Sequence, residues 1–227
     1  MSNDNGARKW RIEVVSPNDE GCCFYLSHYK PFRLAALLED PEAFGSTYAR
    51  EVDFTDDDWV ARLKNPLAKT FVAVRTHDGR VLSATSLIGP LLDSIPASNP
   101  TQVVKEMRNG GDQQQSHEIS PIPFQITGVY TRPEARGQGL GKALAKAATE
   151  HALRQANEKG RALRLSVVVY KSNRAAISFY ESCGFVAGPE GGRAVFNPLK
   201  NFSAEEICMY YHHGSHGQDG SPDRLSK

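Results

Sequence analysis

The chain has 227 residues, of which 40% are hydrophobic, and this suits one large domain with a proper hydrophobic core. Its formal net charge is only +1, which excludes a global attraction to nucleic acid or to an anionic membrane, so any anion site must be local. Residues 1–9 lack the apolar core of a signal peptide, and no run approaches the ~18 apolar residues that span a bilayer. We therefore expect an intracellular, cytoplasmic protein, with the nucleus left open as a location.

The cysteines and histidines give no sign of a metal site. The four cysteines have no metal-ligand spacing and are expected to be free thiols in an intracellular chain: Cys22, Cys23, Cys183 and Cys208. His212, His213 and His216 lie in a tail rich in Gly, Ser and Asp, where no packed structure is expected to hold ligands in place. We therefore expect no bound metal.

The first part of the chain is expected to form a strand followed by helices. Weak alternation over residues 9–15 predicts the strand, and residues 22–38 follow a partly helical pattern with an expected break at Lys30–Pro31. A second helix is predicted over residues 53–63, because Thr55 can cap it and three aspartates fill its first turn.

A β-hairpin is expected next. Residues 70–74 and 80–88 are rich in β-branched residues, and Asp78–Gly79 between them is the signal of a tight turn. The following segment, residues 89–121, is long and partly polar. Loops of this length are usually functional or disordered, so we interpret it as an insertion.

The second half of the chain predicts a strand, a helix and a further strand. The first strand ends at Tyr130, a strongly amphipathic helix covers residues 140–157, and residues 163–170 form an apolar strand. These three elements make a βαβ-like unit with a crossover. Another helix is expected over residues 173–182, and the last strand over residues 207–211.

Three glycines precede the predicted helix at residue 140. The amides of such a turn can close around an anion, which the positive end of the helix dipole also favours. A P-loop is excluded because Gly137 and Gly141 are only three residues apart and Lys142 is not followed by Ser or Thr. A dinucleotide fingerprint is excluded because Lys142 stands where its third glycine belongs. A nucleotide-phosphate binder is therefore the weakest interpretation.

The run Arg-Gly-Gln-Gly-Leu-Gly at residues 136–141 resembles the acyl-CoA loop, Arg/Gln-x-x-Gly-x-Gly/Ala, of the GCN5-related N-acetyltransferase (GNAT) superfamily. A second family element, an Asn seven residues before a Tyr and followed by Gly-Phe, is matched by Asn173, Tyr180 and Gly184–Phe185. The resemblance covers residues 70–211 well. It implies the α/β GNAT fold, a mixed, mostly antiparallel twisted sheet of about six to seven strands flanked by about four helices and splayed at the acetyl-CoA site.

The resemblance implies acetyl-CoA as cosubstrate and assigns a cofactor-binding site. The backbone of Val129, Tyr130 and Thr131 would pair with the pantetheine arm like an added strand. The remaining implied cofactor residues are Arg136, Gly137, Gln138, Gly139, Leu140, Gly141, Lys142 and Asn173. Asn173 either contacts the pantetheine or caps its helix. Lys142, together with Lys146, either meets the 3′-phosphate or simply belongs to an exposed helix face, and the second interpretation is the commoner one.

The implied reaction is direct attack of a primary amine on the acetyl thioester in a ternary complex. The amide of Val129 or its neighbour would stabilise the oxyanion, and Tyr180 would act as the general acid that protonates the departing thiolate. A general base is missing, because Pro123 stands near the position where some members place a Glu. Other conceivable groups, none of them preferred, are His117, Glu118, Glu51 and Asp53. A water relay, or an amine that arrives neutral, is therefore expected.

Several alternatives stay open at this point. A catalytically silent acyl-CoA-binding or sensor module would need the same binding residues, and Tyr180 would then be a buried aromatic anchor. The acceptor can be a small molecule or a peptide, and a protein lysine or N-terminal acetyltransferase would also fit. The implied acceptor walls are residues 32–63, 89–121 and 188–202, whose mixed polarity names no substrate. A homodimer is left open.

The domain boundaries follow from composition. One N-acetyltransferase domain is expected over residues 9–212, with the long insertion at about 89–121. Residues 1–8 and 213–227 are polar and are expected to be disordered ends.

Overall fold

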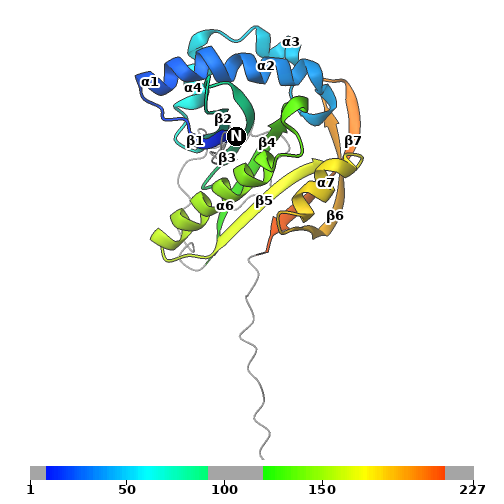
Figure 1. The fold of residues 1–227 in the computed structure, drawn as a ribbon. Helices are drawn as coiled ribbons and strands as arrows, with labels where there is room; N and C mark the ends of the chain where they lie inside the picture. Colours follow the sequence, from blue (N-terminus) through cyan, green and yellow to red (C-terminus); the bar gives the residue numbers. More distant parts are fainter. Residues whose placement is uncertain (1–8, 92–119, 213–227) are drawn as a thin grey trace, which may run out of the picture.

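A computed structural model describes residues 9–91 and 120–212. These residues form one seven-stranded sheet in the order β1-β2-β3-β4-β5-β7-β6, with helices on both faces (Figure 1). Neighbouring strands are antiparallel, except that β4 and β5 run parallel. This confirms the mixed, mostly antiparallel sheet. The expected disordered ends and most of the expected insertion lie outside the described residues.

The strands agree with the predicted ones over most of the chain. They are β1 (Trp10–Val14), β2 (Ala68–Arg75), β3 (Val81–Ile88), β4 (Ile122–Thr131), β5 (Leu163–Tyr170), β6 (Phe185–Asn197) and β7 (Phe202–Tyr211). The hairpin of β2 and β3 is confirmed. The residue pattern does not reveal β6, because a stretch rich in glycine interrupts its alternation where the register shifts, between Ala187 and Gly192.

The helices that follow β1 form one continuous helical segment. It consists of α1 (Asp19–Phe24), a π-helical turn η1 (Tyr25–Tyr29) and α2 (Lys30–Glu39). The expected break at Lys30–Pro31 is therefore wrong. The amide of Lys30 reaches back to the carbonyl of Tyr25, and the proline falls in the first turn of α2, where its missing N–H is tolerated.

Four further helices and two short turns complete the described residues. They are α3 (Tyr48–Val52), α4 (Asp56–Leu63), α6 (Leu140–Glu158) and α7 (Arg174–Glu181), with short 3₁₀ turns η2 (Pro41–Ala43) and η3 (Pro133–Ala135). Thr55 caps α4 in a capping box with Asp58, as its sequence predicts. Among the described residues, no helix combines the length and the apolar character needed to cross a membrane.

The sheet carries a separate hydrophobic core on each face. Helices α1 to α4 cover one face, and α6 lies against the other (Figure 1). In the α6 core, Phe124 of β4 is 2% exposed and packs in the same cluster as Leu144 and Ala148. In the other core, Trp59 of α4 is fully buried among Tyr25 and neighbouring aromatic rings. Strand β4 is thus held from both sides where it carries the candidate site.

Truncating Phe124 should test this support. Phe124→Ala removes a buried ring and should lower the free energy of unfolding by about 3–5 kcal/mol. Phe196→Ala is the matched control, because Phe196 of β6 is 59% exposed and its loss should cost less than about 0.5 kcal/mol. Urea unfolding of both variants measures the difference. Equal losses would contradict a β4 held by the α6 core.

Candidate functional site

The sheet opens between β4 and β5. The two strands pair only where Ile122–Gln125 face Leu163–Ser166, although β5 continues to Tyr170 and pairs on its other edge with β7. The far half of β4, residues 126–131, therefore has no strand neighbour on its β5 side among the described residues. A cavity of about 1150 Å³ occupies this region and extends under helices α2 to α4. Such a splayed edge offers backbone groups to a ligand.

A bulge in β4 aims its backbone at the opening. The register against β3 shifts beside Gly128, whose φ of +62° is a left-handed conformation that favours glycine. The carbonyl of Tyr130 turns toward β3, where it accepts the hydroxyl of Ser83 at 2.7 Å. Because backbone groups alternate along a strand, those of Val129 and Thr131 face the opening.

The glycine turn leads directly into α6. Gly137 and Gly139 have φ of +75° and +79°, so both occupy the left-handed region. The amide of Ala143 donates to the carbonyl of Gly139 at 3.0 Å, whereas the first amides of an α-helix have no intrahelical partner. Gly139 also provides no side-chain cap. The first turn of α6 is thus suited to an anion.

Arg136 fixes this turn to the end of β4 and to α2. Its Nε donates to the carbonyl of Thr131 at 3.1 Å, and its guanidinium pairs with Asp40. The same guanidinium lies 5.7 Å above the ring of Tyr130. Burial and the nearby Glu39 raise the pKa of Tyr130, whose hydroxyl donates to that carboxylate at 2.9 Å. The phenol of Tyr130 therefore stays neutral and acts as a structural anchor.

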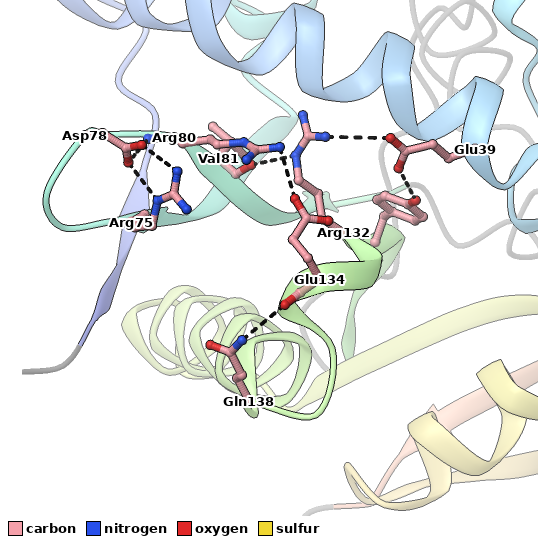
Figure 2. Close-up of polar contacts among 9 residues, drawn as sticks. Glu39, Arg75, Asp78, Arg80, Val81, Arg132, Glu134 and Gln138 are labelled. Atoms are coloured by element: carbon pink, nitrogen blue, oxygen red, sulfur yellow. Dashed lines mark hydrogen bonds and ion pairs between the residues drawn. The ribbon is translucent and has the colours of Figure 1, made fainter.

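A second set of contacts anchors the segment between β4 and α6. Figure 2 shows Arg132 reaching the carbonyl of Val81 at 3.1 Å and the carboxylate of Glu39 at 3.8 Å. Arg80 of the β2–β3 connection pairs with Glu134 at 3.0 Å in the same view. These contacts join the turn to β3 and α2 and limit its movement when a ligand binds.

The residues of the expected cofactor set fall into two groups, those that line the cavity and those that do not. The cavity is lined by Val129, Tyr130, Thr131, Arg136, Gly141 and Asn173. The other members are Gly137, Gln138, Gly139, Leu140 and Lys142, and they do not line it. Leu140 is buried in the α6 core, whereas Gln138 and Lys142 are exposed. Lys146 is also exposed and lies 3.8 Å from Glu150, which fits an ordinary helix surface.

Asn173 begins helix α7 at the edge of the cavity. Its Oδ1 accepts the amide of Ala176 at 3.0 Å, so the side chain caps the helix. Of the two roles expected from the sequence, this is the capping role. Its cofactor contact stays a prediction.

Tyr180 lies about two helical turns after Asn173 in α7 and also lines the cavity. It is 6% exposed, and its ring packs edge-on against Phe179 and Phe185 at centroid distances of 5.1 and 5.5 Å. Burial, with a smaller contribution from Cys183, raises the pKa of Tyr180. The hydroxyl therefore keeps its proton at neutral pH, although it is a weaker acid than an exposed tyrosine.

The opposite wall of the cavity holds a buried ion triad. Glu51 of α3 is 2% exposed and lies between Arg33, at 2.8 and 3.0 Å, and Arg62, at 3.0 Å. Burial would raise the pKa of Glu51, but the hydrogen bonds and charges of the two arginines overcome this and lower it to about 2. Such a carboxylate is a poor general base at neutral pH.

None of the other bases considered from the sequence is supported by position. Asp53 is exposed at the end of α3 and does not line the cavity. His117 and Glu118 lie outside the described residues. Pro123 is buried in β4 where it pairs with β5, so that position supplies no proton acceptor. The described parts of the chain contain no cluster of His, Cys, Asp and Glu that could hold a metal ion.

Sequence reasoning missed several polar residues that line the cavity. They include Arg33 and Arg62, which come from two helices other than that of Glu51, and only the fold brings them to this carboxylate, which the sequence offers as a conceivable base. Glu206 of β7 also lines the cavity and is 6% exposed. The predicted last strand begins at residue 207, and the position of Glu206 beside Tyr170 of β5 follows only from the strand register.

Comparison with known proteins identifies a related family and fold. Residues 103–185 match the sequence model described as the Acetyltransferase (GNAT) family. None of the curated proteins compared with the chain matches it.

Solved structures share the fold at low identity. The yncA structure from Salmonella typhimurium, which contains acetyl-CoA, has a TM-score of 0.56 at 14% identity. The match covers 96% of this chain and 99% of the yncA chain. Spermidine N-acetyltransferase from Vibrio cholerae, in complex with CoA and spermine, has a TM-score of 0.54 at 12% identity. The match covers 90% of this chain and 95% of the spermidine N-acetyltransferase chain. Ribosomal-protein-alanine N-acetyltransferase from Brucella melitensis has a TM-score of 0.53 at 17% sequence identity. This match covers 88% of this chain and 98% of that structure's chain.

The ion triad predicts a pH-dependent stability. The pKa of Glu51 is depressed in the folded state, so its contribution is complete above its ordinary value of 4.5 and is lost as pH falls toward 2. The wild type should lose about 3 kcal/mol from this group between pH 5 and pH 2.

Glu51→Gln should lower the free energy of unfolding by about 2–4 kcal/mol at pH 7, because the partly exposed Arg33 and Arg62 lose their buried carboxylate partner, and it should flatten the acid dependence. Urea unfolding at pH 7 and pH 3 measures both effects. Glu42→Gln, at an exposed carboxylate, is the control. An unchanged acid dependence in Glu51→Gln would refute this role of the triad.

Proposed function

We propose that the chain is an acyltransferase that transfers the acetyl group of acetyl-CoA to a primary amine, because residues 103–185 match the GNAT acetyltransferase model and the fold matches that of solved acetyltransferases. The observation that carries this proposal is the opening between β4 and β5, which leads to a helix start suited to an anion. Acetyl-CoA has the matching parts, a peptide-like arm and a pyrophosphate.

The cofactor is proposed to bind along the splayed edge of β4. The backbone of Val129 and Thr131 would pair with the amides of the pantetheine arm, in the way an added strand binds a sheet edge. The amides of Gly141 and its neighbours in the first turn of α6 would hold the pyrophosphate. Arg136 would have to exchange part of its contact with Asp40 to reach a phosphate.

The proposed chemistry is a direct transfer in a ternary complex. The amine nitrogen attacks the thioester carbonyl carbon, and the amide of Val129 stabilises the oxyanion that forms. The carbon–sulfur bond then breaks, and Tyr180 donates its proton to the departing sulfur. Since burial raises the pKa of Tyr180 further above that of a thiol, the proton transfer itself is uphill, and the phenol would first stabilise the developing thiolate by a hydrogen bond.

The proton lost by the amine is proposed to leave through water. Arg33 and Arg62 lower the pKa of Glu51, so this carboxylate is a poor proton acceptor at neutral pH. Pro123 stands where a strand carboxylate would be needed. A water relay in the cavity, or an amine that enters neutral, therefore remains the consistent solution.

The function is tested by thiol release from acetyl-CoA in the presence of candidate acceptors. A panel of simple amines, polyamines, amino acids, aminoglycosides and peptides should contain acceptors that raise the release rate at least tenfold above acetyl-CoA hydrolysis alone. Mass spectrometry should find the acetylated amine. Binding of acetyl-CoA without any amine-dependent release would favour a silent binding or sensor module. Activity on peptides alone would favour a protein acetyltransferase.

The role of Tyr180 is tested by Tyr180→Phe. This variant should lower kcat by about 100-fold or more, because it removes the proton donor and keeps the packing. Its affinity for acetyl-CoA, measured by calorimetry, should stay within about twofold of the wild type. Tyr211→Phe is a matched control, because that ring also packs on Phe185 at 5.5 Å but does not line the cavity. An unchanged kcat in Tyr180→Phe would remove it from catalysis.

A further inference from the structure

Glu206 has an unusual position for a carboxylate. It lies in β7 with 6% of its surface exposed, and it is one of the residues that line the cavity. Its Oε2 is buried and makes no hydrogen bond among the described residues. Burying a carboxylate oxygen without a hydrogen-bond donor is costly, so a position of this kind needs an explanation.

The only ion pair of Glu206 within the described parts of the chain is a long one. Nη2 of Arg193, the neighbouring residue on β6, lies 3.6 Å from its Oε2. This separation gives charge compensation but exceeds hydrogen-bonding distance, and the arginine side chain is 48% exposed. The carboxylate oxygen thus still lacks a hydrogen-bond donor among the described residues, in a residue that lines the cavity.

The fold places this carboxylate on the acceptor side of the proposed reaction centre. Glu206 is the register partner of Tyr170, the last residue of β5, and β5 borders the opening of the sheet. Tyr170 and the proposed acid Tyr180 line the same cavity. A group bound to Glu206 therefore shares a continuous space with the thioester expected at the opening.

We propose that Glu206 binds the ammonium group of a cationic amine acceptor, an inference that rests on the proposed function. An alkylammonium brings three N–H donors and a positive charge, which satisfy the orphaned Oε2 by a charge-assisted hydrogen bond. Glu51 cannot take this role, because Arg33 and Arg62 already hold both of its oxygens. Glu206 thereby selects amines that carry a charge at neutral pH over neutral compounds of the same size.

The test measures binding without turnover. Spermidine and propylammonium are titrated into the protein saturated with CoA, and binding is followed by ligand-observed NMR. Glu206→Gln should weaken the binding of these cations about 10- to 100-fold, the usual range for losing a hydrogen bond to a charged group. Weak binding of the neutral analogue 1-propanol should not change. Affinity for CoA should stay within about twofold.

Two further variants separate recognition from structure. Glu205→Gln changes the adjacent carboxylate, which is exposed and pairs with Lys171 at 2.8 Å, and it should leave amine binding unchanged. Arg193→Gln removes the ion-pair partner of Glu206 but keeps its carboxylate, so amine binding should be retained or strengthened. If Arg193→Gln weakens amine binding as much as Glu206→Gln does, the pair is structural and the proposal is overturned.

The outcomes also distinguish this inference from the proposed function. Acetyl transfer by the wild type, with amine binding unchanged in Glu206→Gln, would overturn the role of Glu206 and leave the transfer intact. Ammonium binding that depends on Glu206, without any acetyl transfer, would support the recognition site and refute the transfer. No binding of either cation to the wild type would overturn the inference.

Discussion

The early end of the pairing between β4 and β5 is the constraint on which the rest of the site depends. A strand that loses its neighbour exposes backbone N–H and C=O groups, which need partners wherever water is excluded. Here the β4–β5 pairing stops at Gln125 and Ser166, while β5 continues as a strand on its other edge, where it pairs with β7, and β4 carries a bulge at Gly128. The opening is therefore built into the register of the sheet rather than produced by a flexible loop.

The elements around the opening serve to keep its two sides apart. On one side, the α6 core holds β4 through Phe124, and Arg132 and Arg136 fasten the following turn to β3 and α2. On the other side, α7 carries Tyr180 on a short helix whose first turn is capped by Asn173. A cofactor that enters finds both walls preorganised, so little of its binding energy has to be used to order the protein.

Electrostatics divide the cavity into regions of different character. The triad of Arg33, Glu51 and Arg62 is internally paired and carries a net positive charge, whereas Glu206 retains an oxygen without a donor. The triad therefore has a structural role, because removing its buried carboxylate would leave two partly buried arginines without that partner. Only a carboxylate with an unfilled position can bind a cation from solution without first losing an internal contact.

Local signals in the sequence predicted much of the fold. The cap at Thr55, the turn at Asp78–Gly79 and the glycines before α6 act over a few residues, and their consequences can be read without a structure. The same holds for the helix cap at Asn173, which belongs to a short motif of fixed spacing, whereas the cofactor contacts of that motif stay a prediction.

The parts that could not be predicted depend on contacts between distant segments. The helix continues through Pro31 because Tyr25 and Tyr29 pack against Trp59 from α4, which stabilises a π turn that propensity alone would not favour. The neighbours of Glu51 and Glu206 are likewise set by helix packing and by strand register. No spacing in the sequence encodes them, so the acceptor side of the site emerged only from the structure.

The central claim, that the splayed edge of β4 and the first turn of α6 hold acetyl-CoA, is tested most directly by amide hydrogen exchange. Exchange should be compared with and without saturating acetyl-CoA. Our account predicts slower exchange at Val129 and at Leu140–Lys142, with little change in the hairpin of β2 and β3. Saturation by acetyl-CoA without protection at Val129 and in the first turn of α6 would contradict it.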